Sequence, residues 1–206
     1  MKSTKKNWSK NFSILNKQAK FYGVALLAVF TFSCSNDDNE TPPVNEEELI
    51  TTVTAIYTPK GGGTSITLQY KDLDGEGANA PVITVSGAFA KNTTYDGLIT
   101  FKNELASPAE DITPEIVAEG TEHQLFYQKT GTLNPFNYGT AASNFDSNGK
   151  VIGLQSVFAT TGEASGNLTI TLKHEPNKNG ANVAAGDITN AGGSTDAQVT
   201  FSISVQ

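Results

Sequence analysis

Short runs in which apolar and polar side chains alternate make up most of the chain after residue 50. Alternation with a period of two is typical of a β-strand that has one buried and one exposed face. The runs are rich in β-branched residues, and clusters of Gly, Asn and Asp separate them, as turns separate strands. The pattern predicts strands over residues 50–58, 66–70, 82–86, 95–102, 122–129, 151–160, 168–174 and 197–205.

One segment, residues 107–120, departs from this alternation. Thr113 is suited to be a helix N-cap, Pro114 to be the first helical residue, and Gly120 to end the helix. We therefore expect one short helix between two strands. Many short strands with a single helix predict an all-β fold, a two-sheet antiparallel β-sandwich of immunoglobulin-like architecture over residues 50–206.

Two long connections complete the prediction. The segment from Glu175 to Ser194 is rich in Gly, Asn and Ala and is predicted to be a loop. About twenty residues separate the strand ending at Lys129 from the next one, which is long for a structureless loop inside a domain. We therefore expect a further short strand around Thr140 to Phe145.

The first 33 residues have a different pattern. They contain six lysines and no acidic residue, and end in an uninterrupted apolar run of 12 residues from Phe21 to Phe32. A membrane-spanning helix needs about 20 apolar residues, so this order of charge and apolar residues predicts a cleaved signal peptide over residues 1–33. The alternative is a buried N-terminal helix of a cytosolic protein.

The signal-like segment ends at Thr31-Phe32-Ser33-Cys34 and here resembles bacterial lipoproteins, which are cut just before a lipidated cysteine. Ser33 fits the family pattern, whereas Thr31 and Phe32 depart from it. The resemblance implies that Cys34 is lipidated and becomes the mature N-terminus. Cys34 is also the only cysteine of the chain, so it has no internal disulfide partner. A free thiol is the alternative.

Residues 34–49 are polar and acidic and contain two prolines, which predicts a disordered tether. Acidic residues directly after the cysteine resemble the export signal of Bacteroidota-type lipoproteins, which implies outer-membrane localisation on the cell surface; here Asp37, Asp38 and Glu40 occupy these positions. A merely solvated tether, with the protein on the periplasmic face, is the alternative.

The charge balance narrows the class of partner. Six of the 14 basic residues and none of the 21 acidic residues lie in residues 1–33, so signal removal changes the formal net charge from −7 to −13. The remaining lysines are scattered, and the chain contains no arginine. Nucleic-acid binding needs a basic surface that neutralises phosphates, so we expect no nucleic-acid partner.

Several segments together resemble a set of flavobacterial surface lipoproteins of about 200 residues. These segments are residues 72–75 with 79–82, 110–113 with 122–124, 172–176, and 186–193. Members of the set are sometimes labelled as having a type 1 periplasmic binding fold, which implies a doubly wound α/β domain. The alternation described above instead predicts an all-β domain.

A glycine-rich stretch between the second and third predicted strands concentrates oxygen ligands. Hard oxygens on a flexible loop are what Ca²⁺ requires, so a calcium site is one hypothesis for Asp72, Asp74, Glu76 and Asn79. The alternative is a polar turn whose acids accept hydrogen bonds from their own backbone.

Two histidines lie at strand ends, each beside an acidic residue. If the additional strand exists, both fall at the same end of the sandwich, near enough to share Zn²⁺ or Cu²⁺. The candidate ligands are His123, His174, Glu122 and Glu175. The alternative is that each imidazole is a hydrogen-bonded residue at the rim of the core.

No nucleophile motif is present, so we expect no enzyme. The leading hypothesis is an outer-membrane lipoprotein that acts as a binding or accessory module, beside an uptake receptor. A structural or adhesive lipoprotein, stiffened by calcium, is the alternative, and a secreted hydrolase is a remote one. Aromatic residues Tyr127, Phe136, Tyr138 and Phe145 either form a binding surface or fill the end of the core.

Overall fold

The computed structural model describes residues 48–75 and 77–206. The predicted signal peptide, Cys34, the tether up to residue 47 and Glu76 lie outside the described residues. Among the residues that are described, no helix is long and apolar enough to cross a membrane.

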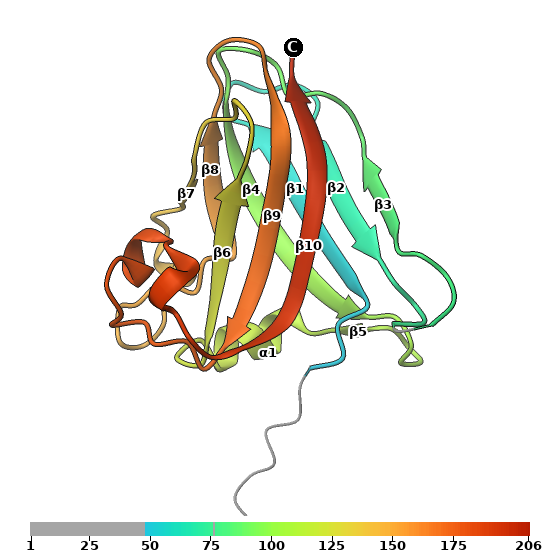
Figure 1. The fold of residues 1–206 in the computed structure, drawn as a ribbon, viewed down its shortest axis with the longest axis vertical. Coiled ribbons are helices and arrows are strands. Elements are labelled where there is room, and N and C mark those ends of the chain that lie inside the picture. The colour runs from blue at the N-terminus through green and yellow to red at the C-terminus, as the bar shows by residue number, and fades with distance from the viewer. Residues whose placement is uncertain (1–47, 76) are drawn as a thin grey trace, which may run out of the picture. The chain divides into compact units, whose positions relative to one another are not determined.

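Two antiparallel sheets face each other, which confirms the predicted β-sandwich (Figure 1). The larger sheet has the order β3-β2-β1-β4-β8-β7, with β5 also paired to β4, and the smaller has the order β10-β9-β6. The larger sheet consists of β1 (Thr52–Pro59), β2 (Ile66–Lys71), β3 (Val82–Val85), β4 (Thr94–Asn103), β5 (Glu110–Asp111), β7 (Phe136–Tyr138) and β8 (Gln155–Ala159). The smaller sheet consists of β6 (His123–Lys129), β9 (Ala164–His174) and β10 (Ser194–Val205).

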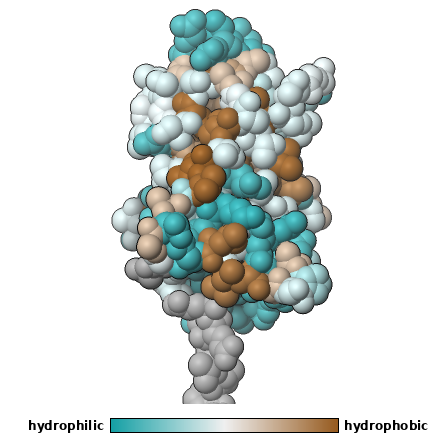
Figure 2. All heavy atoms as spheres, turned by 90° about the vertical axis from the view of Figure 1, so that its right-hand side faces the viewer, coloured by the Kyte–Doolittle hydropathy of each residue, from teal (hydrophilic) through white to brown (hydrophobic). Residues whose placement is uncertain are grey.

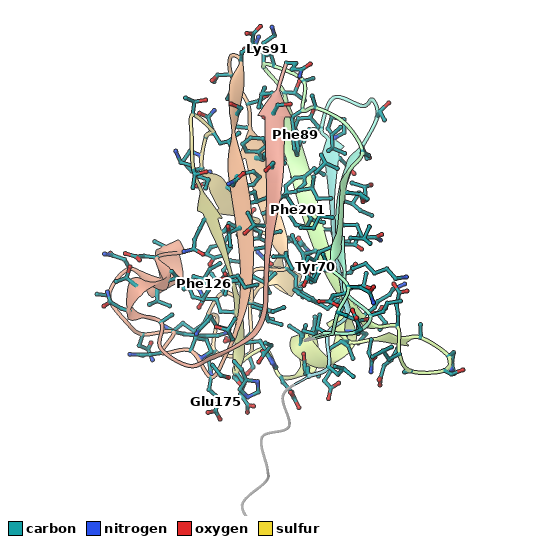
Figure 3. The ribbon with its side chains drawn as sticks, turned by 45° about the vertical axis from the view of Figure 1, so that its right-hand side comes forward. Tyr70, Phe89, Lys91, Phe126, Glu175 and Phe201 are labelled. Atoms are coloured by element: carbon teal, nitrogen blue, oxygen red, sulfur yellow. The ribbon has the colours of Figure 1, made fainter. Side chains whose placement is uncertain are left out.

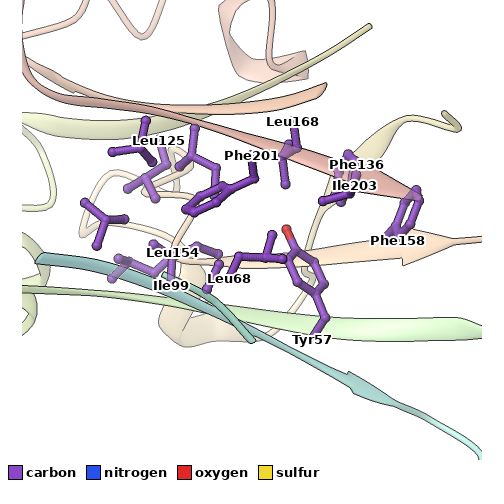
Figure 4. Close-up of a cluster of buried hydrophobic side chains, with 14 of the residues drawn as sticks. Tyr57, Leu68, Ile99, Leu125, Phe136, Leu154, Phe158, Leu168, Phe201 and Ile203 are labelled. Atoms are coloured by element: carbon purple, nitrogen blue, oxygen red, sulfur yellow. The ribbon is translucent and has the colours of Figure 1, made fainter. Parts of the chain in front are cut away.

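The core lies between the two sheets and is built from the inward-facing residues of each strand. Tyr57, Leu68 and Ile99 of the larger sheet face Leu168 and Phe201 of the smaller one, and all five are buried (Figure 4). Each large apolar side chain buried in this way contributes about 1.5–3 kcal/mol. The buried residues thus follow the period-two alternation that predicted these strands.

The one α-helix of the described residues, α1 (Thr113–Ala118), closes one end of the sandwich (Figure 1). The helix is where the sequence predicts it, but the predicted N-cap is wrong by one residue, since Ile112 occupies that position. The hydroxyl of Thr113 instead bonds to Phe101, accepting from its amide at 2.9 Å and donating to its carbonyl at 3.3 Å. Attachment of the helix to β4 thus replaces the expected cap.

The predicted loop over residues 175–194 contains two short 3₁₀ helices, η2 (Val183–Ala185) and η3 (Ile188–Asn190). Val183 and Ala191 of this segment are fully buried against Phe126, on the outer face of β6 (Figure 3). This small second cluster explains why β6 is buried on both faces at its start.

Outside the core, apolar side chains are scattered on the surface. Val82 and Ile83 of the edge strand β3 are 61% and 49% exposed. Figure 2 shows the side of the molecule that carries β3, where separate apolar patches alternate with polar ones.

Candidate functional site

The two histidines lie directly opposite each other on neighbouring strands of the smaller sheet. His123 is the first residue of β6, His174 is the last of β9, and the two are register partners. Both point into the sandwich, as Leu125 and Leu172 do on the same strands. His123 is 0% exposed and His174 6%, and their rings are perpendicular with centroids 4.8 Å apart.

This arrangement confirms the prediction that both histidines share one end of the sandwich. An additional strand does lie between β6 and β8, but it is β7 (Phe136–Tyr138), so its predicted place around Thr140 to Phe145 is wrong. Residues 142–144 form the 3₁₀ helix η1 (Ala142–Asn144) instead. The Asn144 amide explains the difference, because it donates to the carbonyls of Gly139 and Gln155 at 2.9 Å each and thereby holds a compact turn.

A carboxylate that the sequence did not predict lies beside both imidazoles. Asp196 belongs to β10 at a break in its register with β9, where Thr195 pairs with Lys173 and Ala197 already pairs with Leu172. The additional residue of such a β-bulge is turned out of the regular alternation. The Asp196 side chain is 0% exposed, and its Oδ2 lies 3.7 Å from His123 Nε2 and 3.9 Å from His174 Nδ1.

A second carboxylate comes from Glu48, just before β1. The polar, acidic composition of residues 34–49 predicted that this residue belongs to a disordered tether, but its side chain is only 9% exposed and packs against His123. The distance from Glu48 Oε1 to His123 Nε2 is 3.8 Å. Burial raises the pKa of Glu48 to about 7, and the negative charge of Asp196, with smaller contributions from acids at α1, adds to the rise.

The orientation of the His123 ring is set by the end of α1. His123 Nδ1 lies 3.2 Å from the carbonyl oxygen of Glu119, and donation to this acceptor leaves the lone pair on Nε2. Nε2 is buried and makes no hydrogen bond to any of the described residues, and neither does the Glu48 carboxylate. Burial lowers the pKa of His123, although the charge of Asp196 opposes this shift.

The two acids that the sequence placed beside the histidines lie elsewhere. Glu122 and Glu175 are both exposed, and they meet through their backbones, where the amide of Glu175 donates to the carbonyl of Glu122. Because side chains alternate along a strand, the neighbour of an inward-facing histidine points outward. The buried cluster therefore consists of two groups that share His123: one adds His174 and Asp196, and the other adds Glu48 and the exposed Glu119.

The proposed calcium loop is held by its own hydrogen bonds. Asp72 Oδ1 accepts from the amides of Asp74 and Gly75, and Asp74 Oδ2 accepts from the amide and the side chain of Asn79. The bonds from Asn79 lower the pKa of Asp74. These contacts fit the alternative of a self-capped polar turn, and the calcium site, which includes Glu76 outside the described residues, stays a prediction.

A buried ion pair that the sequence did not signal fastens the long 175–193 segment to the sandwich. Lys178 Nζ donates to Asp146 Oδ2 at 2.9 Å, to the carbonyl of Val151 at 3.0 Å and to the carbonyl of Gly120. The side chains of Lys178 and Asp146 are 6% and 1% exposed. Burial raises the pKa of Asp146, but the bonds from Lys178 and from backbone amides outweigh this effect and hold the pKa below its ordinary value.

The aromatic residues considered as a binding surface contribute mainly to packing. Phe136 is buried and stacks on Phe158 with centroids 4.1 Å apart. The hydroxyls of Tyr127 and Tyr138 donate to backbone carbonyls of Gly153 and Leu125. These contacts support the alternative that such residues fill the end of the core.

The outer face of the larger sheet carries a shallow hollow of about 490 Å³. Its floor contains Ile56 and Leu98, which are register partners on β1 and β4 and are 41% and 48% exposed. The ion pair between Lys60 and Asp96 lies at its edge. The hollow thus offers apolar surface beside two opposite charges.

Comparison of the chain with protein families, with curated proteins and with solved structures finds no match.

Proposed function

We propose that the mature protein is anchored by a lipid on Cys34 in the outer membrane, at the cell surface. There it acts as a non-catalytic binding module, accessory to an outer-membrane uptake receptor. The single observation that carries the proposal is the position of Cys34, the only cysteine, directly after a lysine-rich and then apolar segment.

The distance between the anchor and the folded domain supports this role. The 13 residues from 35 to 47 separate Cys34 from Glu48, where the described domain begins. At about 3.3 Å per residue such a segment reaches roughly 43 Å when extended. That length is enough to hold a β-sandwich clear of lipid headgroups and beside a larger membrane protein.

The hollow on the outer face of the larger sheet supports a binding role. Its volume of about 490 Å³ falls within the range of small-ligand sites, roughly 300–1,000 Å³. The exposed pair Ile56 and Leu98 provides apolar contact, and Lys60 with Asp96 provides charged groups at the rim.

Intact-mass measurement of protein extracted from membranes tests the anchor. We expect a chain that begins at Cys34 and carries acyl groups. A Cys34→Ser variant should keep an uncleaved or unlipidated N-terminus and leave the outer membrane. A mature chain beginning at another residue, or a free Cys34 thiol, contradicts the proposal.

Co-purification under native detergent conditions tests the accessory role, with the Cys34→Ser protein as control. A stoichiometric outer-membrane barrel partner that is present only with the anchored protein supports it. Absence of such a partner favours a structural or adhesive lipoprotein. Protease treatment of intact cells then distinguishes the cell surface from the periplasmic face.

A further inference from the structure

We infer that the buried cluster at the end of the sandwich is a binding site for one divalent transition-metal ion of the Zn²⁺ class. Its ligands are His123 Nε2, His174 Nδ1 and Asp196, whose ligand atoms all lie within 4.8 Å of one another, and Glu48, which contacts His123, would move in as the fourth. This inference does not depend on the anchor or on a membrane partner.

The spacing of the candidate ligand atoms is the first argument. The separations from Asp196 Oδ2 to the two imidazole nitrogens are 3.7 and 3.9 Å, and Glu48 Oε1 is 3.8 Å from His123 Nε2. These values exceed the roughly 2.7–3.2 Å of a hydrogen bond. Ligands at about 2.0–2.1 Å from a tetrahedral Zn²⁺ are about 3.3–3.4 Å apart. A contraction of about half an ångström therefore brings Asp196 and the two imidazoles to metal-ligand spacing. Glu48, which is grouped with His123 and Glu119 rather than with His174 and Asp196, must move further to join them.

Two buried polar groups without hydrogen-bond partners provide the second argument. His123 is 0% exposed, and its Nε2 makes no hydrogen bond to any residue in 48–75 or 77–206. The Glu48 carboxylate, 9% exposed, likewise has no hydrogen-bond partner in this part of the chain. Burying a polar group without a hydrogen-bond partner destabilises the folded state. One cation between them would satisfy both.

The contact made by the second ring nitrogen of His123, Nδ1, provides the third argument. Metal-binding histidines typically donate their second ring nitrogen to a carbonyl or carboxylate, which fixes the tautomer and the direction of the lone pair. His123 Nδ1 meets the Glu119 carbonyl in this manner, and Nε2 faces the two carboxylates. A lone pair that faces carboxylates is repelled by them unless a cation or a proton lies between.

The ligand types identify the class of ion. Imidazole nitrogens combined with carboxylate oxygens suit Zn²⁺ and neighbouring transition metals, whereas Ca²⁺ and Mg²⁺ take oxygen ligands. Three buried ligands, with Glu48 moving in as the fourth, would form a closed, structural site rather than a catalytic one with an open position. Such an ion would join β6, β9, the bulge of β10 and the segment that enters β1.

The decisive experiment uses the full chain, purified in detergent without a histidine tag and stripped with a chelator. Zn²⁺ is titrated against a chromophoric competitor, and Co²⁺ is titrated separately because a tetrahedral Co²⁺ site absorbs visible light. Variants His174→Ala, Asp196→Asn and Glu48→Gln each remove one ligand. Glu175→Gln and Glu122→Gln are matched controls, since they alter exposed acids beside the same histidines.

We expect one ion per chain, a melting temperature several degrees higher with Zn²⁺, and a visible Co²⁺ spectrum. Each ligand variant should bind at least about tenfold more weakly, within the range seen when metal-site residues are altered, while both controls bind as the parent does. Circular dichroism without metal identifies any variant that fails to fold, and the near-isosteric Asp196→Asn and Glu48→Gln then decide. The absence of stoichiometric binding by the parent, or equal weakening by the controls, overturns the inference. The same titration on the Cys34→Ser variant measures metal binding without the lipid anchor. A failure of the metal inference can then be distinguished from a failure of the anchor proposal.

Discussion

His123 and His174 are register partners across β6 and β9, with perpendicular rings whose centroids are 4.8 Å apart. Asp196 reaches both rings because β10 carries an additional residue at that level of the sheet. The bulge therefore determines whether Asp196 meets the two histidines, and it can be removed without altering either histidine.

Deletion of Asp196 should leave the fold intact. Thr195 and Ala197 pair with adjacent residues of β9, so the shortened strand can continue the ladder without interruption. We expect the free energy of unfolding to change by less than about 2 kcal/mol, and Zn²⁺ affinity to fall at least about tenfold. Urea unfolding and metal titration measure both.

Deletion of Ser202 is the matched control. Ser202 lies in the regular part of β10, between Phe201 and Ile203. Its loss shifts the register by one residue and turns apolar side chains outward. This variant should unfold or aggregate, and equal behaviour of the two deletions would contradict the assignment of the bulge.

Lys178→Met should destabilise the domain strongly. The substitution leaves Asp146 buried without its cation and removes the donor to two backbone carbonyls. Removing one partner of a buried ion pair costs about 3–5 kcal/mol. Urea unfolding should show this loss, while Lys129→Met, at an exposed position, changes stability by less than about 0.5 kcal/mol.

Low pH should reduce the stability that Asp146 contributes to the folded domain. Its pKa is lowered in the folded protein, so its stabilising effect is present above the unfolded value and is lost as pH falls through the folded value. The stability difference between the parent and Asp146→Asn should therefore be largest near about pH 6 and shrink below about pH 4. A difference that stays constant across this range would contradict the assignment.

Asn144→Asp should destabilise the domain much more than a substitution at an exposed position. The side chain is buried, and the new oxygen would face the carbonyls of Gly139 and Gln155, which now accept from the amide. We expect a loss of about 2–4 kcal/mol in the free energy of unfolding. Asn137→Asp, at an exposed position of β7, is the control and should remain within about 0.5 kcal/mol of the parent.

The amino-acid sequence by itself determined eight of the strands and the short helix, but not the two-residue strand β5. Alternation has a period of two, and turn residues act within a few positions, so both signals are local. The inward orientation of His174 could be predicted from Leu168, Ile170 and Leu172 for the same reason. Counting the strands correctly predicted that both histidines lie at the same end of the sandwich, even though the additional strand was predicted several residues too late in the chain.

Only the tertiary structure decided which carboxylates meet the histidines. Glu122 and Glu175 are neighbours in the sequence, and the alternation of the strand turns such neighbours outward. Asp196 is turned inward by a bulge, and Glu48 by packing of the segment that enters β1. Lys178 and Asp146 likewise meet across the end of the sandwich. These contacts join positions far apart in the chain, and the close packing of two sheets and their connections, rather than any local pattern, brings them together.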